Sequence, residues 1–410
     1  MPHSQAPLAG VRVVELSIAG PAGTTTHLAD LGAEVIKVEP PAGDYIRQMT
    51  WPIIEGTSLM HLHLNRGKQS ITLDLRTEAG QEVFRRLADS ADVVFEAMRP
   101  GALARRGLGF EELRTTNPKL VFASLSGYGA TGPYTSMPSH GIAYDTWAGI
   151  VDPATDDDGF TYIPEHVSIG MYAAPMLMAT SILAAVIRAR ETGEGCFLES
   201  GQSDAAAFFD WYRSETWMAY ERPEDEVTGN PSDDLVRRAP GTAGMREGVR
   251  YQIYASADGH VLFMASEQAF WKNFAEGIGR PDLFERWPGS TYADHARGNR
   301  ELQAELRDIF LTRTSAEWLA FADEVNTPIA PVNSPQTIVD DPQFRDRFEV
   351  LPHGDHGADM LAFPVKFGDE ALPKPGLAPT VGEHTTTVLG GLGLDDAAIA
   401  DLRERGAFGG

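Results

Sequence analysis

Two short basic segments have the clearest capacity for chemistry in this sequence. The first is Asn65-Arg66-Gly67-Lys68, and the second contains Arg99, Arg105 and Arg106. Guanidinium and ammonium groups that are held in loops at the ends of strands can bind the phosphates of an anionic ligand. Solvated surface charge is the alternative for either loop. The sequence therefore offers two candidate anion sites, with an ordinary charged surface left open for each.

The turn after the first predicted strand is a further candidate for phosphate binding. Gly20 and Gly23 flank Pro21 in this turn, and the helix that follows would offer free backbone N–H groups. The dinucleotide fingerprint requires G-x-G-x-x-G, which this turn lacks. An NAD site is therefore disfavoured, whereas a nucleotide-bearing ligand with a different phosphate arrangement stays open.

Metal and hydrolase chemistry have weaker support. The sequence contains two histidine pairs whose spacing resembles that of metal ligands, His61-x-His63 and His353-x-x-His356. No third ligand follows either pair at a suitable spacing. A G-x-S-x-G nucleophile elbow surrounds none of the three candidate serines, Ser124, Ser126 and Ser203. We therefore expect no metal site and no serine hydrolase.

Alternating strands and helices must position these loops. Mostly apolar runs predict strands at 11–16 and 34–39, and the segment 27–31 between them predicts a helix. This spacing is typical of a parallel, right-handed crossover. The fold class is therefore α/β with a parallel sheet. Further buried strands and one amphipathic helix are predicted in the same part of the chain: 70–75, 92–96 and 120–125, with the helix at 80–90.

The composition of the sequence changes near Tyr212, where charged residues become more frequent and long apolar runs become rare. Asp258-Gly259 lies between the short segments 251–255 and 260–265 and predicts a hairpin turn. A second structural region is therefore expected in the middle of the chain. Helical patterns follow it at 269–278, 300–312 and 395–405.

Composition excludes several classes of protein. The chain has 410 residues, which at roughly 150 residues per domain indicates two domains or three. Its 34 basic and 58 acidic residues give a net charge of −24, and such a surface repels nucleic acid and anionic lipid. The single cysteine, Cys196, fits a reducing cytoplasm. The apolar run 173–187 is too short to span a bilayer and predicts a buried helix. We expect a cytoplasmic protein without a nucleic-acid or membrane partner.

Several strings together, in an order and spacing that extend along nearly the whole chain, resemble the family III CoA-transferases. That family includes carnitine and formyl-CoA transferases and the α-methylacyl-CoA racemases. The strings that carry the resemblance are 7–16, 29–39, 65–68, 99–101, 124–129, 131–133, 192–195, 331–333, 341–342 and 382–385.

The resemblance implies a Rossmann-like large domain made from both chain ends, and a smaller α+β domain from the middle. The expected boundaries are 1–211 and 331–410 for the large domain and 212–330 for the small one. It also implies an interlocked homodimer that binds coenzyme A or acyl-CoA as substrate, with no covalently bound cofactor. The residues that we expect to contact CoA are Ala19, Asn65, Arg66, Lys68, Arg99 and Arg105.

The family's transferases use an Asp that attacks the thioester and gives first a mixed anhydride and then an aspartyl-CoA thioester. Two anchors place this residue differently in the present chain. The Gly170-Met171-Tyr172 string puts it at His166, whereas counting back from 182–185 puts it near Met171. Neither position holds Asp. We prefer the first anchor, in which a shift of one residue brings Glu165 to the site as the nucleophile.

Two other strings resemble the racemase branch. Residues 139–144 contain His140, and residues 265–270 contain Glu267. A Glu beside a His raises its basicity and fixes its tautomer, as removal of an α-proton from a thioester requires. Backbone N–H groups can hold the enolate oxygen. Racemisation needs a second acid/base on the opposite face, for which the candidates are Glu165, His166 and Asp145. The alternative is a reaction that needs only one base, as in a double-bond isomerisation.

Three functions follow from the resemblance. The leading hypothesis is proton transfer at the α-carbon of an acyl-CoA, with His140 as the base and Glu267 as its support. The first alternative is CoA transfer between carboxylic acids, with Glu165 favoured over Asp145 as the nucleophile. The second alternative is a non-catalytic CoA-binding subunit of a hetero-oligomer. The acyl group is left open.

Overall fold

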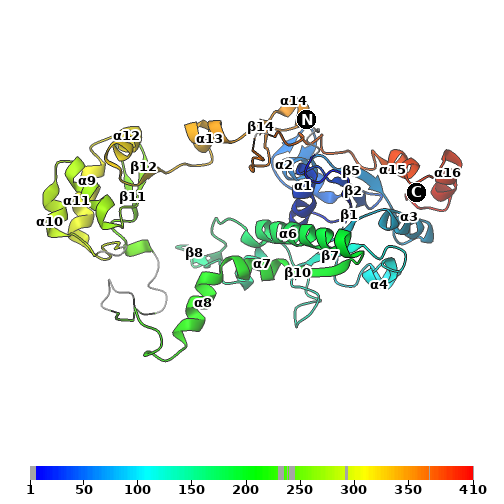
Figure 1. Cartoon of the computed structure of the whole chain (residues 1–410), viewed down its shortest axis with the longest axis horizontal. Coiled ribbons are helices and arrows are strands. Elements are labelled where there is room, and N and C mark those ends of the chain that lie inside the picture. The colour runs from blue at the N-terminus through cyan, green and yellow to red at the C-terminus, as the bar shows by residue number, and fades with distance from the viewer. Residues whose placement is uncertain are drawn as a thin grey trace. The chain divides into compact units, whose positions relative to one another are not determined.

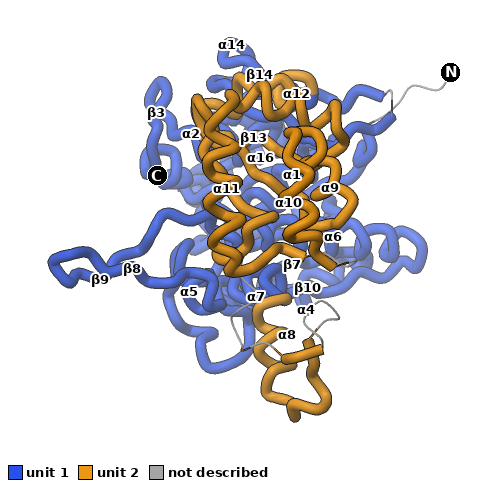
Figure 2. The backbone as a smooth tube through the Cα atoms, turned by 90° about the vertical axis from the view of Figure 1, so that its left-hand side faces the viewer, with its two compact units in different colours: residues 1–211, 347–410 blue, residues 212–346 orange. Residues whose placement is uncertain are grey.

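The computed structural model describes residues 6–229, 235–237, 239, 245–290, 294–368 and 370–409. The chain forms two compact units, which Figure 2 shows in different colours. The large unit comprises residues 1–211 and 347–410, and the small unit comprises residues 212–346. The sequence places the second boundary at residue 331, whereas the small unit continues to Asp346.

A six-stranded sheet organises the large unit and confirms the predicted α/β class (Figure 1). Its strands pair in the order β10-β7-β6-β1-β2-β5, and every pairing is parallel. This order runs outward from β1 in both directions, as in doubly wound folds, and the connections reverse between β1 and β6. The strands are β1 (Arg12–Leu16), β2 (Glu34–Glu39), β5 (Gln69–Thr72), β6 (Val93–Glu96), β7 (Val121–Ser126) and β10 (Cys196–Gly201).

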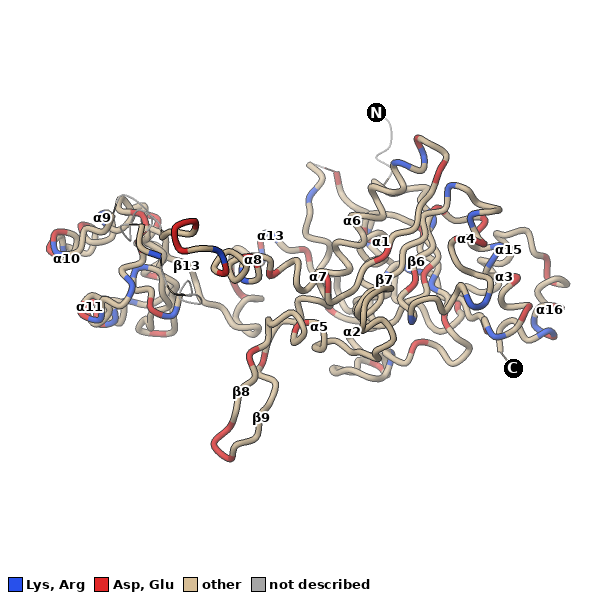
Figure 3. The backbone as a smooth tube through the Cα atoms, turned by 90° about the horizontal axis from the view of Figure 1, so that it is seen from below, with Lys and Arg blue, Asp and Glu red and all other residues tan. Residues whose placement is uncertain are grey.

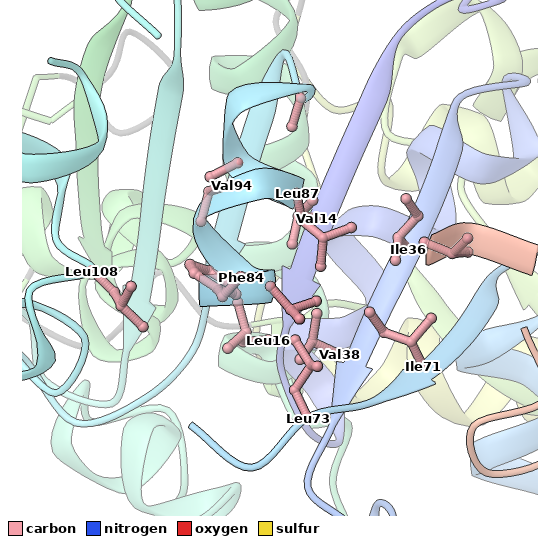
Figure 4. Packing of buried hydrophobic residues seen from close by; sticks show 14 of the residues in the cluster. Val14, Leu16, Ile36, Val38, Ile71, Leu73, Phe84, Leu87, Val94 and Leu108 are labelled. Atoms are coloured by element: carbon pink, nitrogen blue, oxygen red, sulfur yellow. The ribbon is translucent and has the colours of Figure 1, made fainter. Parts of the chain in front are cut away.

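Alternation of side chains along the central strands produces a separate core on each face of the sheet. Val14 packs with Ile36 and Val94 on one face (Figure 4). Val13 packs on the other face with the equivalent residues of β2 and β6. Because both faces are covered, the strands read as continuous apolar runs, which explains why the sequence predicted them.

Helices cover the two faces. The Val13 face is covered by α1 (Gly23–Asp30) and α6 (Ile169–Thr192). The Val14 face is covered by α3 (Glu78–Asp89) together with α15 (Thr385–Gly391) and α16 (Asp396–Glu404). The two C-terminal helices therefore complete the core that the N-terminal residues begin.

Among the described residues, the helix α6 is long and apolar enough to cross a membrane, judged by its length and composition alone. Half of its most apolar window is nevertheless buried inside the protein. Met178 and Ile182 belong to the core on the Val13 face. The helix therefore packs as a core helix, as predicted from the run 173–187, and extends beyond that run at both ends.

The small unit is built on the antiparallel sheet β11-β12-β13. Asp258-Gly259 connects β11 (Gln252–Ala255) to β12 (His260–Phe263), so the predicted hairpin is confirmed. An aromatic core centred on Phe263, Phe274 and Phe310 joins this sheet to its helices. The remaining elements of the unit's folded core are β13 (Ile329–Pro331), α9 (Gln268–Gly277), α10 (Pro281–Arg286), α11 (Arg300–Phe310) and α12 (Ser315–Val325).

Shorter elements decorate both units. The hairpin of β8 (Ala154–Thr155) and β9 (Thr161–Tyr162) projects from the large unit, and Figure 3 shows acidic residues at its tip. The other elements are η1 (Gly20–Ala22), η2 (Tyr45–Gln48), β3 (Ile53–Ile54), β4 (Thr57–Ser58), α2 (Leu59–Asn65), η3 (Ala104–Arg106), α4 (Phe110–Leu113), α5 (Ile142–Trp147), α7 (Gln202–Phe209), α8 (Trp211–Tyr220), η5 (Met245–Glu247), η6 (Ile338–Asp340), α13 (Pro342–Arg347), β14 (Val350–Leu351), α14 (His353–His356) and β15 (Met360–Leu361).

Candidate active site

Two cavities lie at the carboxyl ends of β1 and β6, where the strand order reverses. Ligands of doubly wound folds bind at this point because the loops after the two strands diverge and leave a crevice. The cavities share a wall made of Ile18, Ala97, Met98 and Arg99. The two cavities are therefore adjacent, and we refer to them together as the cleft.

The first part, which we call the His140 cavity, has a volume of about 360 Å³. The β1–η1 turn lines it together with the loop after β7, the Arg99 loop and the start of α6. Ser126 Oγ is buried in this lining and has no hydrogen-bond partner among the described residues. The side chains that could touch a ligand here include Ser126, Tyr128, His140, Tyr144, Met171 and Gln202.

The second part, which we call the arginine cavity, has a volume of about 700 Å³. The ends of β1, β2 and the segment after β5 line it, and three arginines border it: Arg76, Arg99 and Arg106. Arg76 is paired with Asp74 at 2.7 Å, and 78% of its side chain is exposed. The guanidinium of Arg99 is exposed and has no ion-pair partner in the described part of the chain. Among the described residues, the arginine cavity therefore has one unpaired guanidinium, from Arg99, in a lining that also includes the carboxylates of Glu39, Asp44 and Asp74.

A buried charge network holds the β1–η1 turn in place. Lys37 Nζ donates to the Ser17 carbonyl at 2.6 Å, and Lys68 Nζ donates to the Ala22 carbonyl at 2.9 Å. Both ammonium groups contact Glu15, at 3.2 Å from Lys37 and 2.8 Å from Lys68. The turn between these anchors contains Ala19, whose φ of 56° is costly for a residue with a side chain.

The charges in this network stabilise one another. Burial alone would raise the pKa of Glu15, but the ammonium groups of Lys37 and Lys68 outweigh it and lower that pKa to about 2. Burial lowers the pKa of Lys68 to about 8, although Glu15 opposes the shift. Glu15 is therefore an ionised, structural carboxylate beneath the cleft.

The side chains of the first basic loop are buried rather than open to a phosphate. Asn65, Arg66 and Lys68 are all buried. Arg66 donates to both carboxylate oxygens of Asp30, at 3.0 and 2.6 Å, and Lys68 is held by Glu15. These cations neutralise internal carboxylates, so the predicted CoA contacts of this loop do not fit their placement.

The position of the second basic loop agrees better with the predicted CoA contacts. Arg99 borders both parts of the cleft. The predicted Arg105 is outside both linings, and its Nη1 donates to the Pro100 carbonyl at 3.3 Å. Its neighbour Arg106 borders the arginine cavity instead. The sequence reasoning did not single out Arg76, although its place shortly after β5 is the signal that could have identified it.

His140 lines the His140 cavity immediately before the N-terminus of α5, in an exposed position. Gly141 follows it, and a Cβ at Gly141 would lie only 3.0 Å from Met171 Sδ. The lining of this cavity, taken over the described residues, contains no Asp or Glu. His140 and the tyrosines are therefore its candidates for proton transfer.

The predicted carboxylates lie elsewhere. Asp145 is fully buried, and its two oxygens accept hydrogen bonds from the Ser168 hydroxyl and the Gly170 N–H, each at 2.8 Å. It therefore caps the start of α6, which does not suit a nucleophile. Glu165 and His166 lie in the exposed segment before α6, outside the cavity lining, and His166 Nε2 is 3.8 Å from Asp145 Oδ2.

Of the two positions that the resemblance gives for the nucleophile, Met171 is the one that lines the cavity. The anchor that we preferred leads to His166, outside it. Counting within the regular helix α6 keeps register with the core residues, whereas the loop before the helix has no fixed period. The second anchor is therefore the better guide to position here.

Glu267 lies in the small unit, directly before α9, and is exposed. The adjacent Ser266 hydroxyl contacts His295 Nδ1 at 2.7 Å. Because His140 belongs to the large unit, the pairing of His140 with Glu267 stays a prediction.

Comparison with known proteins decides the family. The model of CoA-transferase family III matches residues 8–385. The chain belongs to CoA-transferase family III. It is 30% identical to the probable fatty acyl-CoA transferase Rv3272 of Mycobacterium tuberculosis, over 93% of this chain and 97% of that protein. It is 33% identical to the succinyl-CoA:mesaconate CoA-transferase of Haloarcula marismortui, over 94% and 96% respectively.

A solved structure agrees with this assignment. A CAIB/BAIF family protein from Brucella suis superposes with a TM-score of 0.76 at 28% identity, covering 95% of this chain and all of that one. Enzymes of family III use CoA thioesters, so an acyl-CoA substrate is consistent with the cleft. The relatives are named as CoA-transferases, and the leading hypothesis of racemase-like proton transfer is therefore not supported over CoA transfer.

Proposed function

We propose that this family III chain binds an acyl-CoA along the cleft and transfers CoA between carboxylic acids. The observation that carries the proposal is the division of the cleft into an arginine cavity and a His140 cavity that share one wall. CoA has a matching division, because its phosphates lie at one end and its thioester at the other. The phosphates would lie beside Arg99 and Arg106, and the thioester beside His140.

Transfer requires a carboxylate nucleophile. The carboxylate attacks the thioester carbonyl, the C–S bond breaks, and CoA leaves as a thiolate while a mixed anhydride forms. The thiolate then attacks the enzyme's own acyl carbon of the anhydride and releases the first carboxylic acid, which leaves an enzyme–CoA thioester. We assign the nucleophile to Glu165, the carboxylate that the resemblance favours, which is exposed before α6 and lies outside the His140 cavity lining, so its segment would have to bring it to the thioester. Asp145 is less suitable because its oxygens already cap α6.

Proton transfer is the second candidate because a specific feature favours it. His140 lines the cavity, whereas the described lining includes no carboxylate. The neutral imidazole would take the α-proton of the acyl group, which the thioester carbonyl acidifies. The resulting enolate oxygen would be held by backbone N–H groups.

One pair of experiments separates the two candidates. The protein is incubated with acyl-CoA, and its intact mass is measured before and after hydroxylamine. CoA transfer predicts a hydroxylamine-sensitive CoA adduct that is absent in Glu165→Gln and present in the control Glu191→Gln, an exposed residue near the far end of α6.

The alternative outcome is equally specific. Absence of the adduct, together with deuterium incorporation at the α-carbon that is lost in His140→Ala, would reject CoA transfer in favour of proton transfer. A third role, as a CoA-binding subunit of a hetero-oligomer, is excluded by turnover in the purified single chain. The interlocked homodimer is a further prediction, which light scattering of that sample measures.

A further inference from the structure

A third cavity lies next to the His140 cavity in the large unit and has a volume of about 480 Å³. This size falls in the range of small-ligand sites, roughly 300–1,000 Å³. We call it the apolar cavity. Its lining comes from α1, α2, the start of α6 and β15. The side chains that give it this character are Trp51, Leu59, Met60, Leu64, Pro175 and Leu361.

Met171 and Gly20 separate the two cavities. Both residues line the His140 cavity and the apolar cavity. Gly20 has no side chain, and a Cβ there would lie 3.2 Å from Met171 Cε, so the thioether packs directly against the turn. A methionine side chain has three rotatable bonds and adapts its shape readily. The partition is therefore Met171, whose flexible thioether and whose backbone carbonyl, 3.4 Å from a Cβ at Gly20, both lie against the turn.

Charge distinguishes the apolar cavity from the rest of the cleft. Its lining holds no Lys or Arg in the part of the chain that the structure describes. Burial and the nearby Arg66 lower the pKa of His63 to about 4, and burial also lowers the pKa of His27. Both imidazoles are therefore neutral near pH 7. The one carboxylate, Asp359, is exposed and accepts a hydrogen bond from the His353 N–H at 2.9 Å.

The cations nearest to these histidines are already engaged. Arg66 holds Asp30 through two hydrogen bonds, and Lys68 contacts Glu15 at 2.8 Å. A carboxylate that entered the apolar cavity would gain no cationic partner, and only the neutral imidazoles of His27 and His63 could replace part of its hydration, which is unfavourable for an ionised group. An apolar chain would lose no such interaction and would gain contacts with the lining.

We propose that the apolar cavity receives the acyl group of the bound acyl-CoA, and that this group is an uncharged hydrocarbon chain without a second carboxylate. The proposal rests on the CoA site of the preceding section. It assigns the substrate class: monocarboxylic acyl-CoA of medium length, with the chain passing Met171.

Calorimetric titration of the wild-type protein tests this assignment with four ligands: CoA, acetyl-CoA, hexanoyl-CoA and adipoyl-CoA. The last two have acyl chains of the same length and differ by a terminal carboxylate. We expect hexanoyl-CoA to bind at least tenfold more tightly than CoA, and adipoyl-CoA to bind no more tightly than acetyl-CoA. Equal affinity for hexanoyl-CoA and adipoyl-CoA would overturn the assignment.

A second experiment fills the apolar cavity with a larger side chain. Met60→Trp adds bulk to the lining, and Met49→Trp makes the same change at a residue that is 61% exposed and outside the three cavities. We expect Met60→Trp to remove the preference for hexanoyl-CoA while the affinity for free CoA stays within twofold of wild type. A preference unchanged in Met60→Trp would contradict the proposal. Failure of free CoA to bind the wild-type protein would instead reject the CoA site itself, and the acyl site with it.

Discussion

The two basic loops of the large unit have similar compositions and different surroundings. Residues 65–68 precede β5, and the cations among them are buried against Asp30 and Glu15. Arg99 and Arg106 follow β6 and border the cleft. Ligands of a doubly wound sheet meet the loops that follow its strands. Whether a loop enters or leaves its strand therefore matters more here than how many cations it contains.

The carboxylates associated with the two regions show the same contrast. Glu15 is buried beside two lysines, which lower its pKa to about 2 against the effect of burial. Glu96, at the end of β6, is buried and has no cationic partner among the residues that the structure describes, and burial raises its pKa although the Ser124 hydroxyl and the Met98 N–H donate to it. The first network is a buried ion cluster, whereas Glu96 in the second pairs with hydrogen-bond donors and leaves Arg99 and Arg106 at the border of the arginine cavity.

The largest expected effect is on stability, from breaking an ion pair of the first loop. Arg66→Ala leaves Asp30 buried without its cation, so we expect the free energy of unfolding to fall by about 3–5 kcal/mol. Urea unfolding of the variant and the wild type measures the difference. A loss below about 1 kcal/mol would show that this loop is not the structural one.

The next largest effect is expected on CoA binding, from a substitution in the second loop. Arg99→Ala removes an exposed guanidinium from the cleft, and a charge-assisted hydrogen bond is worth about 1.5–3 kcal/mol. We therefore expect CoA affinity to fall by roughly 10- to 100-fold, with stability unchanged. Arg105→Ala is the matched control because Arg105 is outside both cavity linings. Equal losses of affinity in the two variants would remove the distinction between them.

A smaller effect concerns pH. The raised pKa of Glu96 means that its protonated form is favoured by folding, so its contribution to stability is present at low pH and is lost as pH rises through the folded-state pKa. Glu96→Gln keeps the shape without the charge. We expect the variant and the wild type to have similar stability at pH 4 and the variant to be the more stable at pH 8. Unfolding at both pH values measures this, and a constant difference would contradict it.

The smallest effect is expected at the partition. Met171→Ala shortens the side chain between the His140 and apolar cavities. We expect the affinity for free CoA to change less than about twofold, because the proposed phosphate site is in the arginine cavity, and the affinity for branched acyl-CoA to rise by a few-fold. Titration with both ligands measures the change. A large loss of CoA affinity would show that Met171 lies in the CoA-binding part instead.

Sequence patterns predicted the large unit well because its strands are buried on both faces. The predicted strand 34–39 coincides with β2. The predicted strand 70–75 ends earlier in the structure, because Leu73 makes the last hydrogen bond to β2, at the Glu39 carbonyl, and the next N–H, of Asp74, bonds to the Ala407 carbonyl. Such a contact depends on residues far apart in the chain, which no local pattern reveals.

The site was less predictable for the same reason. The partner of Arg66 is Asp30, 36 residues away, and neither residue lies in a motif that pairs them. The approach of Met171 to Gly20 depends on how α6 crosses the end of β1. His140 and Arg99 were identified because resemblance and charge mark them directly. Site residues that depend on tertiary contacts therefore could not be predicted from the sequence pattern.

The structure of this protein with an acyl-CoA bound is the most direct test of the central claim. The account predicts phosphates beside Arg99 and Arg106, the thioester beside His140, and the acyl group beyond Met171. CoA phosphates bound at residues 65–68, or a thioester outside the His140 cavity, would contradict it.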